Sequence, residues 1–187
     1  MANSSYIFGA RFYGSVIGAP VSGALIPMAF VATDNVTAFV GDVLKMTGES
    51  TAINGVSYPV VAQAAAGDTM IGTASSFKED PTNLTLLHRT ASTARVVYVS
   101  VDPNYKYIMQ MNGTPAAGDV GQTYNVTVGS GSTITGISAM QLDRSTAGND
   151  KQFRVIGLYP AEDNEWGAYA KVVCIPNMHQ YKVTTAV

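Results

Sequence analysis

The sequence contains few charged residues. Of its 187 residues, 11 are Lys or Arg and 13 are Asp or Glu, which makes 13% charged and a formal net charge of −2. Soluble domains usually carry roughly 25%. Without a basic field we expect no nucleic-acid partner, and a hydrophobic content of 47% excludes a disordered chain. A weakly charged surface suits extensive protein contact, but a Thr- and Ser-rich β domain has the same composition.

Cysteine and long apolar runs are also scarce. The single cysteine, Cys174, excludes an internal disulfide, and its place in the apolar run Lys171–Ile175 predicts a buried strand thiol. The longest apolar run, Gly23–Ala32, includes Pro27 and is far shorter than the ~20 residues of a membrane span. The N-terminus has no signal-peptide pattern. We therefore expect synthesis in a cytoplasm and no membrane partner.

Catalytic and metal-binding patterns are missing as well. The two histidines, His88 and His179, are far apart in the sequence, and we expect each at the surface or at an interface. There is no nucleophile elbow, zinc motif or phosphate-binding loop. The acidic cluster Glu162–Glu165 does not match the spacing of a calcium loop. We expect no enzyme activity, no cofactor and no metal site.

The sequence does contain many short apolar or alternating runs, bounded by Gly, Pro, Asn and Asp. Such runs are typical of strands, and we expect little helix. About ten short strands predict an all-β fold, with a single β-sandwich or β-barrel domain over residues 25–187. No repeat of roughly 20–50 residues is apparent, and we interpret the recurring Gly-Asp pairs as a shared type of turn. The predicted strands are Leu25–Ala32, Thr37–Met46, Val56–Ala62, Thr69–Phe77, Ala94–Val101, Tyr105–Met111, Gln122–Val128, Thr133–Leu142, Gln152–Tyr159 and Ala168–Ile175.

Residues 1–24 have neither a helical nor a strand period, and we interpret them as an extended N-terminal arm. The arm carries Tyr6, Phe8, Phe12 and Tyr13, with Arg11 among them. Aromatic residues and arginine dominate the binding energy of protein interfaces. The aromatics must be buried either on their own domain or on a neighbouring molecule, and the sequence leaves both open.

A second candidate site surrounds the only tryptophan, Trp166, with Tyr169 close by. A tryptophan of this kind can anchor a loop on the core or at an oligomer interface. It can also form a stacking platform for a sugar. We therefore take Trp166 and Tyr169 as candidates for an interface or a ligand platform.

Four segments resemble a known family: the opening ANSSYIFGARFYGS, then Pro59–Gly72, Arg89–Tyr98 and Asp163–Lys171. Together they are similar to the capsid decoration, or cement, proteins that tailed bacteriophages encode beside the major capsid gene. The similarity extends over nearly the whole chain. It is a likeness of texture and segment order, and it includes no catalytic signature.

The resemblance implies a structural role. Such proteins bind the outer face of an icosahedral capsid after shell expansion and bridge neighbouring major capsid proteins. The implied partners are the major capsid protein and further copies of the chain, as a homotrimer or, alternatively, a dimer. The implied location is the virion surface, and the arm residues would contact the capsid or a sister subunit.

Two other functions remain open at this stage. A carbohydrate-binding or adhesin-like β module would use Trp166, Tyr169 and Tyr159 as exposed aromatics. A β-sandwich hydrolase would need His88 or His179 in a pocket with an acidic residue.

Overall fold

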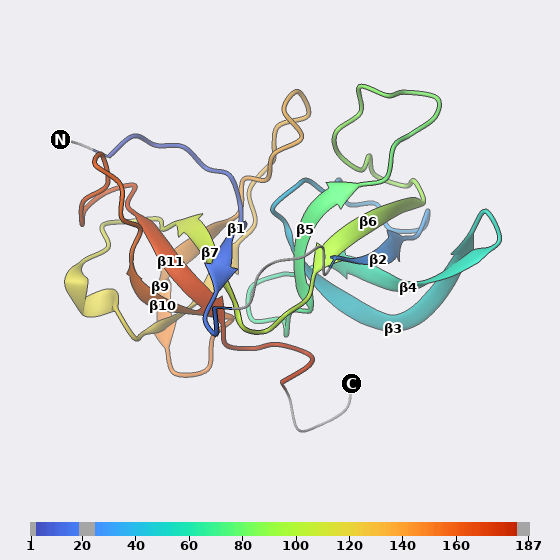
Figure 1. Cartoon of the computed structure of the whole chain (residues 1–187). Helices are drawn as coiled ribbons and strands as arrows, with labels where there is room; N and C mark the ends of the chain where they lie inside the picture. The colour runs from blue at the N-terminus through green and yellow to red at the C-terminus, as the bar shows by residue number, and fades with distance from the viewer. Residues whose placement is uncertain (1–2, 19–24, 183–187) are drawn as a thin grey trace.

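A computed structural model describes residues 3–18 and 25–182. Within them the chain is nearly all β, which confirms the predicted fold class (Figure 1). The one helical turn is a 3-10 turn at Ala117–Asp119, η1. The strands are β1 (Arg11–Ser15), β2 (Leu25–Phe30), β3 (Val43–Ile53), β4 (Val56–Gln63), β5 (Gly72–Phe77), β6 (Arg95–Ser100), β7 (Tyr105–Gln110), β8 (Thr123–Thr127), β9 (Gln141–Gly148), β10 (Phe153–Leu158) and β11 (Lys171–Pro176).

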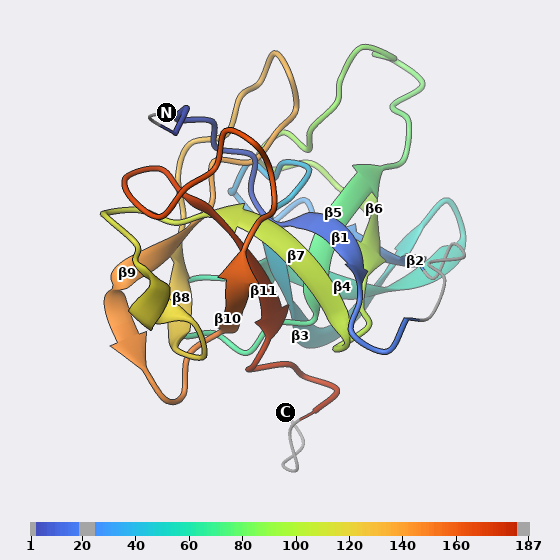
Figure 2. The same ribbon diagram turned by 60° about the vertical axis from the view of Figure 1, so that its left-hand side comes forward.

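The strands form two β units that lie side by side (Figures 1 and 2). We call the closed barrel β2-β4-β3-β5-β6 the N-terminal unit and the six-stranded sheet β1-β7-β11-β10-β8-β9 the C-terminal unit. Each unit encloses its own buried apolar cluster. The C-terminal cluster also receives Val43, Ala64 and Met70 from the N-terminal unit, so the two cores are packed into one molecule.

The two units have the same strand connectivity. In the N-terminal unit the first strand lies parallel to the third, through Ala29 and Val60. In the C-terminal unit a parallel bridge between Met111 and Leu142 joins the residue after β7 to β9 in the same way. β3 pairs with β4 and β5, just as β8 pairs with β9 and β10. β6 pairs with β5 and β2, just as β11 pairs with β10 and β7. Strands β7–β11 therefore repeat β2–β6, and β1 is an addition.

Register and core positions repeat too. Each unit closes the connection between its fourth and fifth strands with one backbone hydrogen bond, from Lys78 N to Val96 O at 2.9 Å and from Tyr159 N to Lys171 O at 3.0 Å. The two units thus form a structural repeat with an offset of about 80 residues. Equivalent buried positions hold Met28 and Met109, Phe30 and Met111, Leu44 and Tyr124, Val61 and Leu142, Ala74 and Val155, Val97 and Val172, and Val99 and Cys174.

The period of the structural repeat exceeds the roughly 20–50 residues of the repeats that the sequence lacks, and the sequence did not predict it. Few equivalent positions share a residue type, so the sequence hides the copy. One visible trace is the pair Val40-Gly41 and Val120-Gly121, which precedes the second strand of each unit. Both glycines have positive φ, 93° and 88°, a conformation that favours glycine over residues with a Cβ.

Two strand predictions need correction. Residues Arg11–Ser15 form the edge strand β1, antiparallel to β7, inside the segment expected to be an extended arm. Residues 19–24 of that predicted arm lie outside the described residues. The predicted strand Thr133–Leu142 is wrong over most of its length, because a turn fills residues 133–135 and β9 starts at Gln141. β9 is a partly exposed edge strand, so its side chains are polar and do not produce the apolar pattern of a strand.

A corner formed by residues 40–42 joins the main parts of the fold. Gly41 N donates to Ala74 O on β5, and Gly41 O accepts from Ala10 N of the N-terminal segment, both at 2.8 Å. Val40 N donates to Gly136 O in the loop before β9 at 2.9 Å. The corner therefore contacts both units and the N-terminal segment through its backbone.

Asp42 completes the corner with a buried carboxylate. Its Oδ2 accepts hydrogen bonds from Phe39 N and from Gln63 Nε2, each at 2.8 Å, and Ser138 also hydrogen-bonds the carboxylate. Burial raises the pKa of Asp42, and these hydrogen bonds only partly oppose the rise. No cation pairs with this carboxylate among the described residues.

The first prediction compares the two equivalent glycines. A Cβ on Gly41 would lie 2.6 Å from Phe8 O, whereas a Cβ on Gly121 would meet nothing within 4 Å. Gly121→Ala should lower the free energy of unfolding by about 1–2 kcal/mol, the cost of a left-handed backbone conformation in a residue with a Cβ. Gly41→Ala should lower it clearly more, because the N-terminal segment must also move. Urea unfolding of both variants measures the difference. Equal losses of unfolding free energy in the two variants would show that the close approach of Phe8 O to Gly41 does not affect stability.

The second prediction concerns pH. Because the pKa of Asp42 is raised on folding, the folded state binds its proton more tightly than the unfolded chain, and the contribution of Asp42 to stability falls as pH rises through the raised pKa. Asp42→Asn removes that term, so its stability relative to the wild type should increase from pH 4 to pH 7 in urea unfolding.

Asp68→Asn is the control with the opposite sign. Burial raises the pKa of Asp68, but hydrogen bonds from Lys45 and Ala65 outweigh it, and the net pKa is lowered. Lys45 Nζ lies 2.7 Å from Asp68 Oδ2. Asp68→Asn should therefore lose stability relative to the wild type as pH rises from about 2 to about 4, because the stability from a lowered pKa is complete above the unfolded value of roughly 3.9. A pH trend of the same sign in both variants contradicts these assignments.

Candidate binding face

Four segments gather on one side of the molecule, which we call the loop face. They are residues 3–10, 78–94, 128–140 and 159–170, and they lie along the top in Figures 1 and 2. Loops 78–94 and 159–170 are the equivalent connections of the two units, so the structural repeat places both at the same end. The loop face therefore extends across both units.

Arg95, the first residue of β6, braces loop 78–94 from inside. Its guanidinium donates to the carbonyl oxygens of Lys78 at 3.0 Å, of Leu86 at 2.9 Å, and of His88. The same group lies over the ring of Phe77, 5.5 Å from its centroid. These bonds join the start and the middle of the loop to β6.

Arg89 braces the same loop against the connection that follows β2. Its side chain is fully buried and donates to the carbonyl oxygens of Val31 at 2.8 Å and Thr93 at 2.9 Å. The carboxylate of Asp34 lies 3.6 Å away and balances the charge. A buried guanidinium is stable only when its donors are satisfied. The hydrogen bonds of Arg89 therefore hold loop 78–94 against the connection that follows β2.

Two asparagines hold loop 159–170. Buried Asn164 donates to the carbonyl oxygens of Tyr159 at 2.7 Å and Lys171 at 2.8 Å, and accepts from Lys171 N at 2.9 Å. Asn3 donates to Glu165 O and Ala168 O and accepts from Glu165 N, all at 2.8 Å. Asn3 therefore joins the N-terminal segment to the tryptophan loop, the two regions that the sequence indicated separately.

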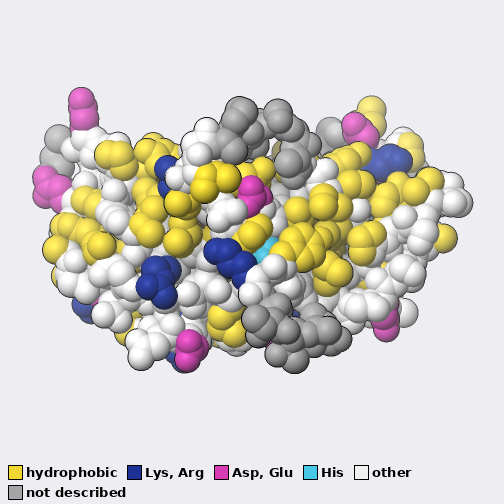
Figure 3. All heavy atoms as spheres, turned by 60° about the horizontal axis from the view of Figure 1, so that its bottom comes forward, with side chains coloured by type: hydrophobic (Ala, Val, Ile, Leu, Met, Phe, Trp, Pro, Cys, Tyr) yellow, Lys and Arg dark blue, Asp and Glu magenta, His cyan; other side chains and the backbone are white. Residues whose placement is uncertain are grey.

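The loop face exposes large apolar side chains at its tips. The exposed fractions are 89% for Ile134, 76% for Leu84, 56% for Tyr6, 53% for Leu87 and 48% for Tyr169. Apolar tips on braced loops are typical of binding surfaces, because a fixed loop loses little entropy on docking. In a view turned so that the bottom of Figure 1 comes forward, charged groups are few and scattered among hydrophobic ones (Figure 3). Scarcity of charge is therefore not confined to the loop face.

The predicted arm residues divide between this face and the interior. The rings of Tyr6 and Phe8 lie together, with centroids 5.9 Å apart. Phe12 packs edge-on against Tyr105 at 4.9 Å and joins the C-terminal core. Tyr13 is exposed and packs edge-on against Tyr159 at 5.5 Å. In this chain the aromatics of the segment are thus buried partly on their own molecule.

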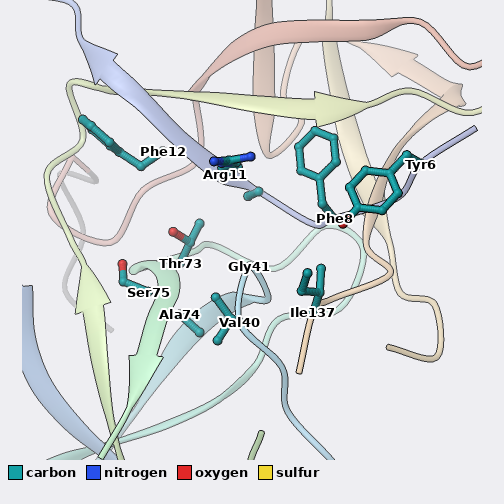
Figure 4. A pocket seen from close by; sticks show the side chains of 11 residues that line it. Tyr6, Phe8, Arg11, Phe12, Val40, Gly41, Thr73, Ala74, Ser75 and Ile137 are labelled. Atoms are coloured by element: carbon teal, nitrogen blue, oxygen red, sulfur yellow. The ribbon is translucent and has the colours of Figure 1, made fainter. Parts of the chain in front are cut away.

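Arg11, the remaining arm candidate, borders a cleft of about 490 Å³ between the two units, which we call the arm cleft (Figure 4). One wall comes from the N-terminal segment and β1, and the other from β5 and the corner. The lining residues are Tyr6, Phe8, Ala10, Arg11, Phe12, Val40, Gly41, Thr73, Ala74, Ser75 and Ile137.

The tryptophan loop exposes one of its two candidates. Trp166 is half-buried and packs against the core of the C-terminal unit. Tyr169 is exposed and has a positive φ of 63°. Tyr159 pairs its ring with Tyr13, and among the described residues no ring pairing joins it to Trp166 or Tyr169. The three aromatics named for a sugar platform therefore do not stack together.

The expectation of surface histidines is wrong. His88 is buried and stacks on Phe39, with ring centroids 5.3 Å apart. His179 is buried too, and its Nδ1 accepts from Tyr181 N at 3.1 Å. Burial lowers the pKa of His179 to about 4, so its ring is neutral at neutral pH. Both fill packing positions, and neither lines the arm cleft.

Other reactive groups are equally enclosed. The thiol of Cys174 is buried on β11, as predicted, and burial raises its pKa, which keeps it protonated. Within residues 3–18 and 25–182, no group of three or more His, Cys, Asp or Glu residues could hold a metal ion. The same residues include no helix with the length and apolar content to cross a membrane.

Comparisons with known proteins returned no match among protein-family models, curated proteins or solved structures. The interpretation of the loop face therefore depends on its geometry and chemistry.

Sequence reasoning missed the residues that build the loop face. Asn3, Asn164 and Arg95 act through hydrogen bonds to backbone carbonyls far away in the sequence or across a loop. Polar residues in loops are common, and no spacing rule separates a brace from a solvated side chain. The sequence indicated Leu84 and Ile134 as binding residues only weakly, because they are apolar residues inside turn-rich segments.

The third prediction tests the link between the N-terminal segment and the tryptophan loop. Asn3→Ala removes three hydrogen bonds, including the acceptor of the Glu165 amide. Hydrogen exchange of the Glu165 amide should accelerate about fivefold, since one hydrogen bond contributes roughly 1 kcal/mol. Asn83→Ala in loop 78–94 is the control and should leave that amide unchanged. Exchange that is insensitive to Asn3→Ala contradicts the proposed link.

Proposed function

We propose that the chain is a capsid decoration protein that binds the outer surface of an icosahedral phage capsid and stabilises neighbouring major capsid proteins. The observation that carries the proposal is the loop face, on which both units expose apolar tips from loops fixed by internal hydrogen bonds. The resemblance of four sequence segments to decoration proteins supports the same function.

The loop face suits a broad partner surface. Several shallow contacts made at once give avidity, because after the first contact the others form within one complex. Aromatic and aliphatic tips supply binding energy when they are buried, and the low charge of the chain reduces the cost of removing water. The partners we propose are the major capsid protein and further copies of the chain, with a homotrimer favoured over a dimer.

The direct test is the composition of purified virions. Quantitative mass spectrometry should find the chain in many copies per particle, and cryo-EM should place it at lattice symmetry sites on the outer surface, with the loop face toward the shell. Absence of the chain from virions would refute the proposal.

The fourth prediction tests the loop face itself. The double variant Leu84→Ser, Ile134→Ser should bind expanded capsid shells at least tenfold more weakly, because interface anchors contribute more than about 1 kcal/mol each. Both side chains are highly exposed, so the fold should be unaffected.

Val56→Ser, Ile156→Ser is the matched control, since these residues are exposed but lie outside the loop face. It should bind shells as the wild type does, in co-sedimentation at several protein concentrations. Equal binding by both double variants would refute the loop face as the docking surface.

A further inference from the structure

The arm cleft borders one strand edge that has no neighbour among the described residues. β1 is an edge strand of the C-terminal unit, and within residues 3–18 and 25–182 it pairs only with β7. On the other wall, Ala74 of β5 is already paired with the corner, since its N donates to Asp42 O at 2.9 Å and its O accepts from Gly41 N at 2.8 Å. Figure 4 shows the two ribbons on either side of the cleft. An unpaired edge such as that of β1 can accept an added extended segment.

The polar groups around the cleft favour a ligand that accepts hydrogen bonds. Arg11 is the one charged residue in the lining, it is exposed, and its guanidinium has no ion-pair or hydrogen-bond partner among the described residues. The hydroxyls of Tyr6 and Ser75 also have no hydrogen-bond partner there. All three groups can donate, and a guanidinium pairs best with a carboxylate, through two parallel hydrogen bonds.

The remaining walls are apolar. Phe8 and Phe12 line one side, and Val40 and Ile137 line the other. The volume of about 490 Å³ lies within the range of ordinary ligand sites, and such sites are frequent between domains. The chemistry therefore matches a carboxylate next to an apolar group.

We propose that the arm cleft binds an extended acidic peptide segment of the partner chain. The segment would lie along the edge of β1, with a Glu or Asp side chain on Arg11 and a neighbouring apolar side chain against Phe8 and Ile137. The free edge of β1 favours a polypeptide, because a sugar would leave that edge unused. The identity of the partner in this inference rests on the proposed function. The class of ligand rests only on the chemistry of the cleft.

The fifth prediction uses a combinatorial library of acetylated, amidated heptapeptides as the probe. Immobilised wild-type chain should retain peptides with Asp or Glu beside an apolar residue, and bound peptide should slow hydrogen exchange in β1. Arg11→Gln should weaken the binding of a selected peptide at least tenfold. Arg154→Gln, an exposed arginine on β10 outside the cleft, should bind it as the wild type does.

Retention of peptides without acidic residues, or equal affinity of the Arg11→Gln variant, would overturn the cleft assignment. Retention of acidic oligosaccharides without any peptide would also overturn it and would identify a carbohydrate site. Virion composition separates this inference from the proposed function. A chain absent from virions but selective for acidic peptides would refute the function alone, and a virion-bound chain whose Arg11→Gln variant keeps full peptide affinity would refute the cleft alone.

Discussion

The corner at residues 40–42 is the constraint on which the rest of the structure depends. Its backbone holds the N-terminal segment, β5 and the loop before β9 at one point, with three hydrogen bonds between 2.8 and 2.9 Å. Position 41 favours glycine, because φ is positive and a Cβ there would lie 2.6 Å from Phe8 O. The corner lines the arm cleft and also holds two of the four segments of the loop face, residues 3–10 and 128–140.

The second feature is the use of polar side chains inside the loops. Arg89, Arg95 and Asn164 contribute little to a hydrophobic core, but each satisfies carbonyl groups that would otherwise be unpaired. The loops are therefore ordered without regular structure, and their apolar side chains can point outward. Low overall charge and exposed apolar tips are compatible because the few arginines at the loops are enclosed by backbone acceptors.

The sequence predicted the fold class because alternation and turn residues are local signals. The strand over residues 94–101 was placed almost correctly, since both faces of β6 are largely buried and four of its six residues are apolar. β9 was misplaced because it is a half-exposed edge with polar side chains. Of the candidate site, Tyr6, Phe8 and Arg11 do come together at a cleft, but the braces at Asn3 and Arg95 depend on long-range contacts that no local pattern contains.

The repeated architecture has a consequence for how the chain folds during synthesis. Two neighbouring copies with the same strand order could exchange equivalent strands, and misassembly of this kind is a recognised failure of tandem repeats. Several equivalent core positions differ in size, as with Leu44 and Tyr124 or Ala74 and Val155, so a strand placed in the wrong copy would leave a void or a clash. The difference in core residues between the two units thus disfavours the exchange of equivalent strands during folding.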